Sequence, residues 1–179
     1  NSLRITDYGY GSRVTSAAMF AACDRLGMAQ LLTRIGLVLD GNDEAGLDSA
    51  RAAWLEAADW QGVRRMAEDS LVVTDWFETF VAQYLDGIIH PLVYGTFDDA
   101  GLDHGATAVS MMSEFMVDWM KDNARWVDAL VQVTAKESAA NAELISGWYR
   151  AWRDRAVEAA SPLAITVLGA ADAVQTIRE

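Results

Sequence analysis

The sequence is poor in proline, the residue that is least tolerated inside a helix. Its 179 residues include only Pro91 and Pro162. Proline lacks a backbone N–H and its ring clashes with the preceding turn, so it kinks or interrupts helices. The scarcity of proline therefore permits very long helices, and we expect a kink at Pro91 and an interruption at Pro162.

Cysteine is nearly absent as well. The single Cys23 excludes an intrachain disulfide and favours a reducing compartment, so we expect a cytoplasmic protein. Cys23 follows the apolar run 17–22, which predicts a buried thiol without a catalytic role. The sequence begins with Asn1 instead of methionine, so we expect further residues before it.

Basic residues are few. Lysine and arginine number 14 against 26 aspartates and glutamates, which gives a net charge of −12. Nucleic acids and anionic membranes both recruit basic side chains, so we expect neither as a partner. The sequence also lacks any run of 18 uncharged apolar residues, so no membrane-spanning helix is expected.

Apolar residues are abundant, at 52% of the chain, and they recur at helical spacing. The pattern predicts four helical blocks and no strands. Ser12 and Asp48 are the predicted caps of the first two blocks. The second block should divide into a short helix through Trp54 and a long one from about residue 60. The four blocks span 12–39, 48–94, 106–135 and 139–169, with an acidic loop at 95–105.

The apolar residues of these blocks form stripes that we expect to face a common core. The connection at 136–138 is short, which favours antiparallel neighbours. The predicted fold is therefore all-α, a single domain over residues 1–179 built as a long four-helix bundle of the ferritin-like type. The stripe of the first block includes Met19, Phe20, Cys23, Leu26 and Leu31, and that of the third includes Met112, Phe115, Met116, Trp119, Trp126, Leu130 and Val133.

Bundles of this type often hold two iron ions, and the required ligands can be sought in the sequence. The site takes a glutamate from each of two helices and a Glu-x-x-His pair from each of the other two. Here Gly87 and Gly101 stand three residues before the two histidines, His90 and His104. No Glu-x-x-His pair occurs, so we expect no diiron site in this chain. Neither a Gly-x-Ser-x-Gly motif nor a cysteine–histidine pairing is present, so no catalytic, cofactor-binding or metal-binding residue is assigned.

Paired charges follow one helical face of the second block. Arg64–Glu68 and Arg65–Asp69 are each separated by four residues, a spacing at which opposite charges attract on a helix. We expect surface ion pairs. The alternative is a polar remnant of a former metal site.

A different chemistry is suggested by the acidic segment at 97–103. The sequence FDDAGLD, with Asp98 and Asp99, loosely resembles the aspartate-rich magnesium motif of class I terpene cyclases. Against a magnesium-dependent enzyme, these aspartates fall in a predicted loop and no second metal motif follows on a later helix.

Six segments of the chain carry a family resemblance: DRLGMAQ at 24–30, DWQGVRRMAED at 59–69, DWFETFVAQ at 75–83, DGIIHPLVY at 86–94, EFMVDW at 114–119 and RWVDA at 125–129. In their order and spacing they resemble the hydroxylase β subunits of bacterial multicomponent diiron monooxygenases. The phenol hydroxylase, toluene and alkene monooxygenase members are the most similar. The resemblance extends from about Tyr8 to Trp152.

The resemblance implies a ribonucleotide reductase-like helical fold and a supporting role. In that family the α subunit holds the diiron centre and inserts one oxygen atom of O₂ into a phenol, aromatic hydrocarbon or alkene. NADH-derived electrons arrive from a reductase. The β subunit lacks the iron ligands and joins α and γ in an α₂β₂γ₂ assembly, on which the reductase and a regulatory protein dock. The family's β subunits are longer, so this chain is expected to be the C-terminal portion of one.

Seven tryptophans in a chain of this length are unusual. Most are expected in the core. Tryptophan is also enriched in subunit interfaces, so some could contact a partner. The expected subunit contacts are Trp60, Trp76, Trp119 and Trp126. A helical interaction protein without an oxygenase partner remains a third possibility beside the two enzyme classes.

Overall fold

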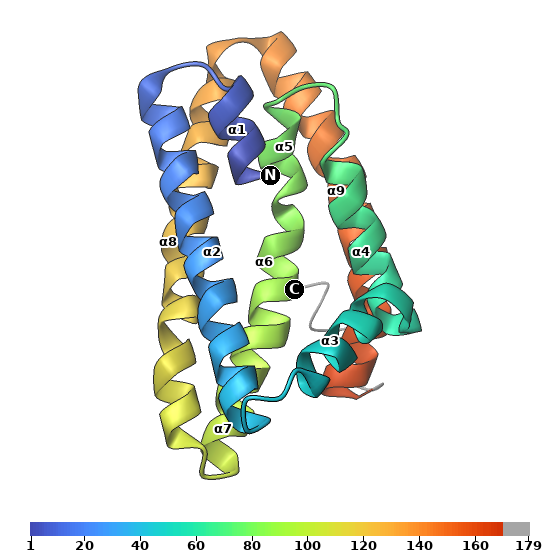
Figure 1. The fold of residues 1–179 in the computed structure, drawn as a ribbon. Coiled ribbons are helices and arrows are strands. Elements are labelled where there is room, and N and C mark those ends of the chain that lie inside the picture. Colours follow the sequence, from blue (N-terminus) through green and yellow to red (C-terminus); the bar gives the residue numbers. More distant parts are fainter. Residues whose placement is uncertain (170–179) are drawn as a thin grey trace.

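A computed structural model describes residues 1–169, except for the side chains of residues 84 and 85 (Figure 1). Every regular element of the described part is a helix. The elements, in chain order, are α1 (Ser2–Tyr8), α2 (Ser12–Leu39), α3 (Ala45–Glu56), α4 (Ala58–Ser70), α5 (Glu78–Ala82), α6 (Tyr84–His90), the π-helical turn η1 (Pro91–Gly95), α7 (Thr96–Asp103), α8 (Thr107–Glu137) and α9 (Ala139–Leu168).

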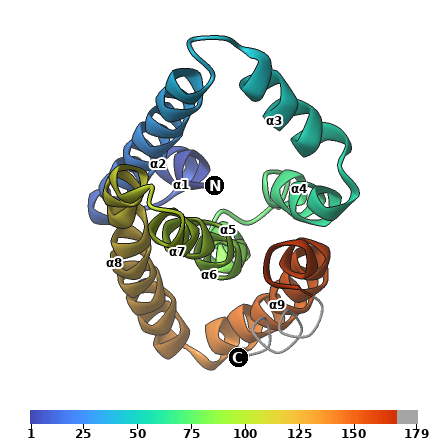
Figure 2. The same ribbon diagram turned by 90° about the horizontal axis from the view of Figure 1, so that it is seen from below.

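The three longest helices, α2, α8 and α9, run along the length of the molecule (Figure 1). The segments α5, α6, η1 and α7 follow one another as a central column, which contacts α8 and α9. Helix α4 packs along α9, and α2 packs against α1 and α3 (Figure 2). The architecture is an all-α, ferritin-like bundle, which confirms the predicted fold class.

The apolar core lies where α4, α5 and α9 meet. Gly62 on α4 makes this contact possible, because a Cβ atom at this position would lie 2.6 Å from the carbonyl oxygen of Ala159 on α9. The indole N–H of Trp152 donates to Glu78 Oε1 at 2.9 Å, so this large core side chain is also satisfied as a donor. The core includes Val63, Met66, Phe77, Phe80, Val81, Ile145, Trp152, Ala156 and Leu163.

The long helix predicted from about residue 60 to 94 is wrong, because the chain breaks at 71–77. Arg4 of α1 reaches this segment and donates to the carbonyl oxygens of Leu71, at 2.8 Å, and Val73. These carbonyls therefore have partners without a continuing helix. The carboxylate of Asp75 then accepts the backbone N–H of Phe77 at 2.8 Å, which supports the start of the next helix.

At Pro91, where a kink was predicted, the α-helix changes to a π-helical turn. The prediction of a loop at 95–105 is wrong, because α7 occupies most of these residues. Helix α9 also continues through Pro162, which was predicted to interrupt it. Leu163 and Ala164, immediately after this proline, are buried in the core, and their burial favours the continued helix.

Two expected caps are also corrected. The helix predicted to begin at Ser12 does begin there, but Gly11 occupies the cap position and no side chain caps the helix. Helix α3 begins at Ala45, whose N–H donates to Asp43 Oδ1 at 2.9 Å, so Asp48 lies within the first turn. Local turn chemistry upstream, and not Asp48, sets this boundary.

Surface ion pairs follow the prediction only in part. The Arg64 side chain bonds to Glu68 at 2.9 Å, as expected. The prediction that Arg65 pairs with Asp69 is wrong, because Asp69 pairs with Arg155 of α9. Because Arg155 and Asp69 lie on different helices, their ion pair links α4 to α9.

Part of each predicted core stripe is exposed. Cys23, expected to be buried, lies on the surface. No helix among residues 1–169 is long and apolar enough to cross a bilayer. Several other residues of the predicted stripes are also uncovered. They include Met19, Phe20 and Leu26 of α2, and Met112, Phe115 and Val133 of α8.

Candidate functional site: a polar cluster between three helices

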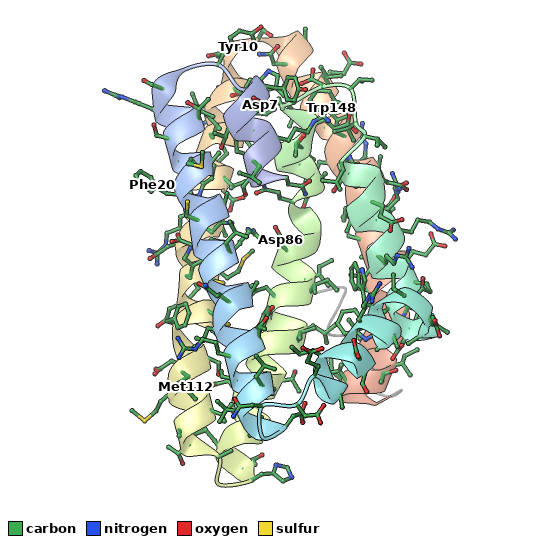
Figure 3. All side chains as sticks on the ribbon, in the orientation of Figure 1. Asp7, Tyr10, Phe20, Asp86, Met112 and Trp148 are labelled. Atoms are coloured by element: carbon green, nitrogen blue, oxygen red, sulfur yellow. The ribbon has the colours of Figure 1, made fainter. Side chains whose placement is uncertain are left out.

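An ion pair joins α2 to the central column. Arg25 on α2 donates to Asp86 Oδ2 on α6 at 2.8 Å, and each side chain is about one-third exposed. Figure 3 labels Asp86 on the side of α6 that faces α2. A cavity of about 280 Å³ borders the pair and is lined by Asn1, Ser2, Leu3, Ala22 and Leu26 as well. The pair is thus partly desolvated and joins elements 61 residues apart.

Trp119 brings α8 into the same cluster. Its indole N–H donates to Asp24 Oδ2 at 2.8 Å, and its ring lies 5.0 Å from the Arg25 guanidinium carbon. This distance is within the range of a cation–π contact. Neighbouring residues Asp24 and Arg25 therefore bind different helices, and together they hold α2 to both α6 and α8.

His90 and Tyr94 lie on the inner side of this cluster. The His90 ring is 4.5 Å from that of Tyr94 and 6.2 Å from that of Trp119. His90 is only 7% exposed, and among the described atoms its Nε2 has no hydrogen-bond partner. Burial lowers the pKa of His90, Asp86 raises it, and Arg25 lowers it again. The neutral imidazole is therefore favoured here.

The pKa of Tyr94 shifts in the opposite direction in the same surroundings. Burial raises the pKa of its phenol, the Arg25 charge lowers it, and the Asp86 charge raises it. The phenol therefore stays protonated at neutral pH. The site accordingly contains two neutral rings beside one ion pair, and together these groups join α2, α6 and α8.

The cluster does not fit a diiron centre. That centre needs four carboxylates and two imidazoles. The cluster supplies the carboxylates of Asp24 and Asp86 and the imidazole of His90, together with the cationic Arg25, which would repel iron. Within the described residues no group of three or more His, Cys, Asp or Glu side chains could hold a metal ion. That this chain binds no metal stays a prediction.

The aspartates considered for magnesium lie elsewhere. Asp98 and Asp99 are on helix α7, not in a loop. Asp98 Oδ1 accepts the hydroxyl of Ser110 at 2.6 Å and lies 3.4 Å from that of Ser113, both on α8. This carboxylate is therefore used to join α7 to α8. His104, at the end of α7, has its Nδ1 2.8 Å from the carbonyl oxygen of Ala100.

The four tryptophans expected at subunit contacts all touch their own chain. Trp60 packs near Trp54, at 6.0 Å between ring centroids. Trp76 and Trp126 both meet Phe80, edge to face at 6.1 Å and 5.5 Å. Trp119 belongs to the polar cluster. These contacts explain why the residues are partly buried, and contact with another subunit stays a prediction.

Sequence reasoning missed Arg25 and Asp86 as site residues. One signal was present, because Asp24 and Arg25 are the sole charges between residues 14 and 33. A charged side chain within a long apolar stretch of helix usually has a partner. The identity of that partner, 61 positions away, is not encoded in any local spacing.

Comparison with known proteins decides the family. A model of the methane/phenol/alkene hydroxylase family matches residues 1–138. The chain belongs to this family. Phenol 2-monooxygenase oxygenase component DmpL, from Pseudomonas sp. (strain CF600), is 44% identical over 173 residues. The corresponding component MhpL of Acinetobacter pittii (strain PHEA-2) is 42% identical over 144 residues.

Solved hydroxylase structures share the fold. Phenol hydroxylase from Pseudomonas sp. OX1, in a xenon-pressurised crystal, matches 99% of this chain with a TM-score of 0.88 and 40% identity. Toluene 4-monooxygenase, with toluene in its resting active site, matches 99% with a TM-score of 0.81. At 21% identity, this second likeness supports the fold alone.

The chain spans about half the length of the hydroxylase proteins that it matches. The DmpL match covers 96% of this chain and 52% of DmpL, and the MhpL match covers 79% and 43%. The two structural matches cover 54% and 57% of the other chains. That these residues form the C-terminal portion of a longer subunit stays a prediction.

Proposed function

We propose that these residues form part of the non-catalytic β subunit of a cytoplasmic diiron monooxygenase hydroxylase. The complete enzyme would insert one oxygen atom of O₂ into a phenol or a related aromatic hydrocarbon or alkene. NADH would supply electrons through a reductase. The subunit would join α and γ in an α₂β₂γ₂ assembly, to which the reductase and a regulatory protein dock, and the diiron centre would belong to α.

One observation carries the assignment to a non-catalytic subunit. The chain belongs to a hydroxylase family, yet its interhelical polar cluster is completed by the Arg25–Asp86 ion pair. The Arg25 guanidinium lies 2.8 Å from the Asp86 carboxylate and neutralises the negative charge that a metal ion would need. The buried His90 adds one imidazole, whereas the family's iron site requires two.

The substrate class is supported by the relatives. Two proteins more than 40% identical to this chain are oxygenase components of phenol 2-monooxygenases. Phenol is therefore the first substrate to test. Its selection would depend on the partner that holds the iron.

In this role the chain contributes by positioning. Its polar cluster fixes α2 against α6 and α8, and its α4/α9 contact forms a rigid apolar core. A scaffold of this kind holds partner helices in a fixed geometry, so that an active site elsewhere stays preorganised.

Co-purification with metal analysis tests the proposal. The tagged subunit is produced with and without the other hydroxylase components, and iron is measured in each preparation. We expect iron only when a second, larger subunit is recovered, and phenol hydroxylation only after a reductase and NADH are added. Stoichiometric iron in the tagged subunit alone would refute the non-catalytic assignment. Failure to recover any iron-containing subunit would favour an interaction protein without an oxygenase partner.

A further inference from the structure

Helix α2 has an unusual surface for a helix at the outside of a bundle. Between residues 14 and 33 its charged residues are Asp24 and Arg25. Both are engaged within the chain, with Trp119 and Asp86. A helix with one side in water normally has charged residues on that side. Over five turns, α2 therefore presents no unengaged charge to solvent.

The same helix exposes large apolar side chains. Phe20 is 70% exposed and Leu26 is 65% exposed. The picture with side chains shows Phe20 on the outer side of α2 (Figure 3). On α8, Phe115 and Met112 lie four and seven residues before Trp119, hence on the face that meets α2. We call Met19, Phe20, Cys23, Leu26, Met112 and Phe115 the α2/α8 face; all six are exposed.

The chain itself buries a different side of α2. The buried positions there are Ala18, Ala21, Ala22 and Met28, which are mostly small. The larger side chains Phe20 and Leu26 are thus on the uncovered side. Large apolar side chains exposed along one side of a helix mark a place where another element can pack. The periodicity that predicted a core stripe here is satisfied only if something covers the α2/α8 face.

A second copy of this chain is a poor occupant. Each copy has a net charge of −12. Glu114 lies beside Phe115 on α8 and is exposed. Association through this face would bring the two acidic surfaces together, and their repulsion opposes it.

The relatives' length points to a different occupant. DmpL and the phenol hydroxylase chain each contain about as many further residues as they share with this chain, since the matches cover 52% and 54% of them. We propose that the α2/α8 face is covered by an apolar helix from the part of the hydroxylase subunit that residues 1–179 do not span. This rests on the proposed function in one respect, the membership of these residues in a longer hydroxylase subunit.

Cys23, the single cysteine of the chain, lies within the α2/α8 face and reports on whether it is covered. The hydroxylase is purified at full length with its partners, and thiol labelling of Cys23 is followed by mass spectrometry. The control carries Cys23→Ser with Ser146→Cys, which places the thiol at an exposed position of α9. We expect Cys23 to be labelled on the order of tenfold more slowly than the control thiol, or slower still. Equal rates would overturn the proposal.

A photo-cross-link identifies the occupant. Phe20 is replaced by the phenylalanine analogue p-benzoylphenylalanine, and the assembled hydroxylase is irradiated. The expected product joins Phe20 to a peptide of the same subunit outside residues 1–179. Cross-links to another subunit or to a second copy of residues 1–179, or none at all, would overturn the proposal. Val72, which is 76% exposed outside the face, is the matched control site and should give no such product.

Failure of this inference and failure of the proposed function can be distinguished. Iron and subunit content are measured in the same preparations. Recovery of an iron-containing partner, with Phe20 cross-linked to that partner, would leave the proposed function intact and refute this inference. A cross-link within the subunit, in a preparation without any iron-containing partner, would do the reverse.

Discussion

Two helix contacts in this molecule, α4/α9 and α2/α8, are built in opposite ways. The first is mainly apolar, with the backbone of Gly62 close against that of Ala159 and the Arg155–Asp69 ion pair at its surface. The second depends on polar groups, through the Asp24–Trp119 hydrogen bond and the stacking of Arg25 on the same indole. The first contact is complete within the chain. The second leaves apolar surface of both helices exposed, so its packing depends on a further element.

The largest loss of stability is expected from a substitution at Gly62, in the α4/α9 contact. Replacing it with alanine puts a Cβ 2.6 Å from the Ala159 carbonyl oxygen and 2.9 Å from its Cα, so α4 and α9 must separate. We expect the free energy of unfolding to fall by about 1–3 kcal/mol, the usual cost of overpacking a core. Chemical denaturation of the purified protein followed by circular dichroism measures the change.

Gly147 on α9 provides the matched control. It is exposed, and a Cβ there would meet no described atom within 4 Å. Alanine at this position should be neutral or stabilise by up to about 1 kcal/mol, because glycine is a poor helix former. Equal losses at Gly62 and Gly147 would show that the α4/α9 contact is not tight.

A smaller effect is expected at the polar contact. Arg25→Met leaves Asp86 without its ion-pair partner and removes the stacking on Trp119. Because both charged side chains are about one-third exposed, we expect a loss of about 1 kcal/mol. A double-mutant cycle with Asp86→Leu, measured by denaturation, isolates the coupling between the two residues.

The Lys121–Asp118 pair on α8 is the control for this cycle. Its side chains are 63% and 67% exposed, so Lys121→Met should change stability by less than about 0.5 kcal/mol. If Arg25→Met lowers the free energy of unfolding no more than Lys121→Met does, the polar cluster does not stabilise the packing of α2 against α6 and α8.

The smallest effect concerns pH. Burial lowers the pKa of His90 in the folded chain, so the unfolded chain binds more protons as the pH falls through 6.5, the usual histidine pKa. The contribution of neutral His90 to the free energy of unfolding is therefore fully present above that pH. It is lost as the pH falls towards the pKa of His90 in the folded chain. His90→Gln should flatten this part of the profile measured by denaturation at several pH values. His104→Gln, at an exposed position, should leave it unchanged; the same flattening there would contradict the assignment to His90.

The long helices could be predicted from sequence because their periodicity is uninterrupted. The observed α2, α8 and α9 begin and end within about two residues of the predicted blocks. The break at 71–77 was missed because its carbonyls are satisfied by Arg4, from a distant helix. A local signal was present, since Asp75 and Glu78 have the spacing of a helix-start motif.

The side of α2 that is buried could not be predicted, for a different reason. Periodicity locates a core face by contrast with polar residues, and α2 is apolar or small on nearly every side between residues 14 and 33. The buried Ala22 and the exposed Phe20 both fit an apolar stripe. The Arg25–Asp86 contact was equally hidden, because it depends on how two distant segments meet.

The π-helical turn at Pro91–Gly95 sets the rotational phase of helix α7, which begins at the next residue. A π-turn closes one residue later than an α-turn, and one residue corresponds to roughly 100° of helical rotation. Helix α7 is therefore turned relative to the path that an unbroken α6 would take. This phase directs Asp98 towards Ser110. A turn that closed one residue earlier would place a different face of α7 against α8.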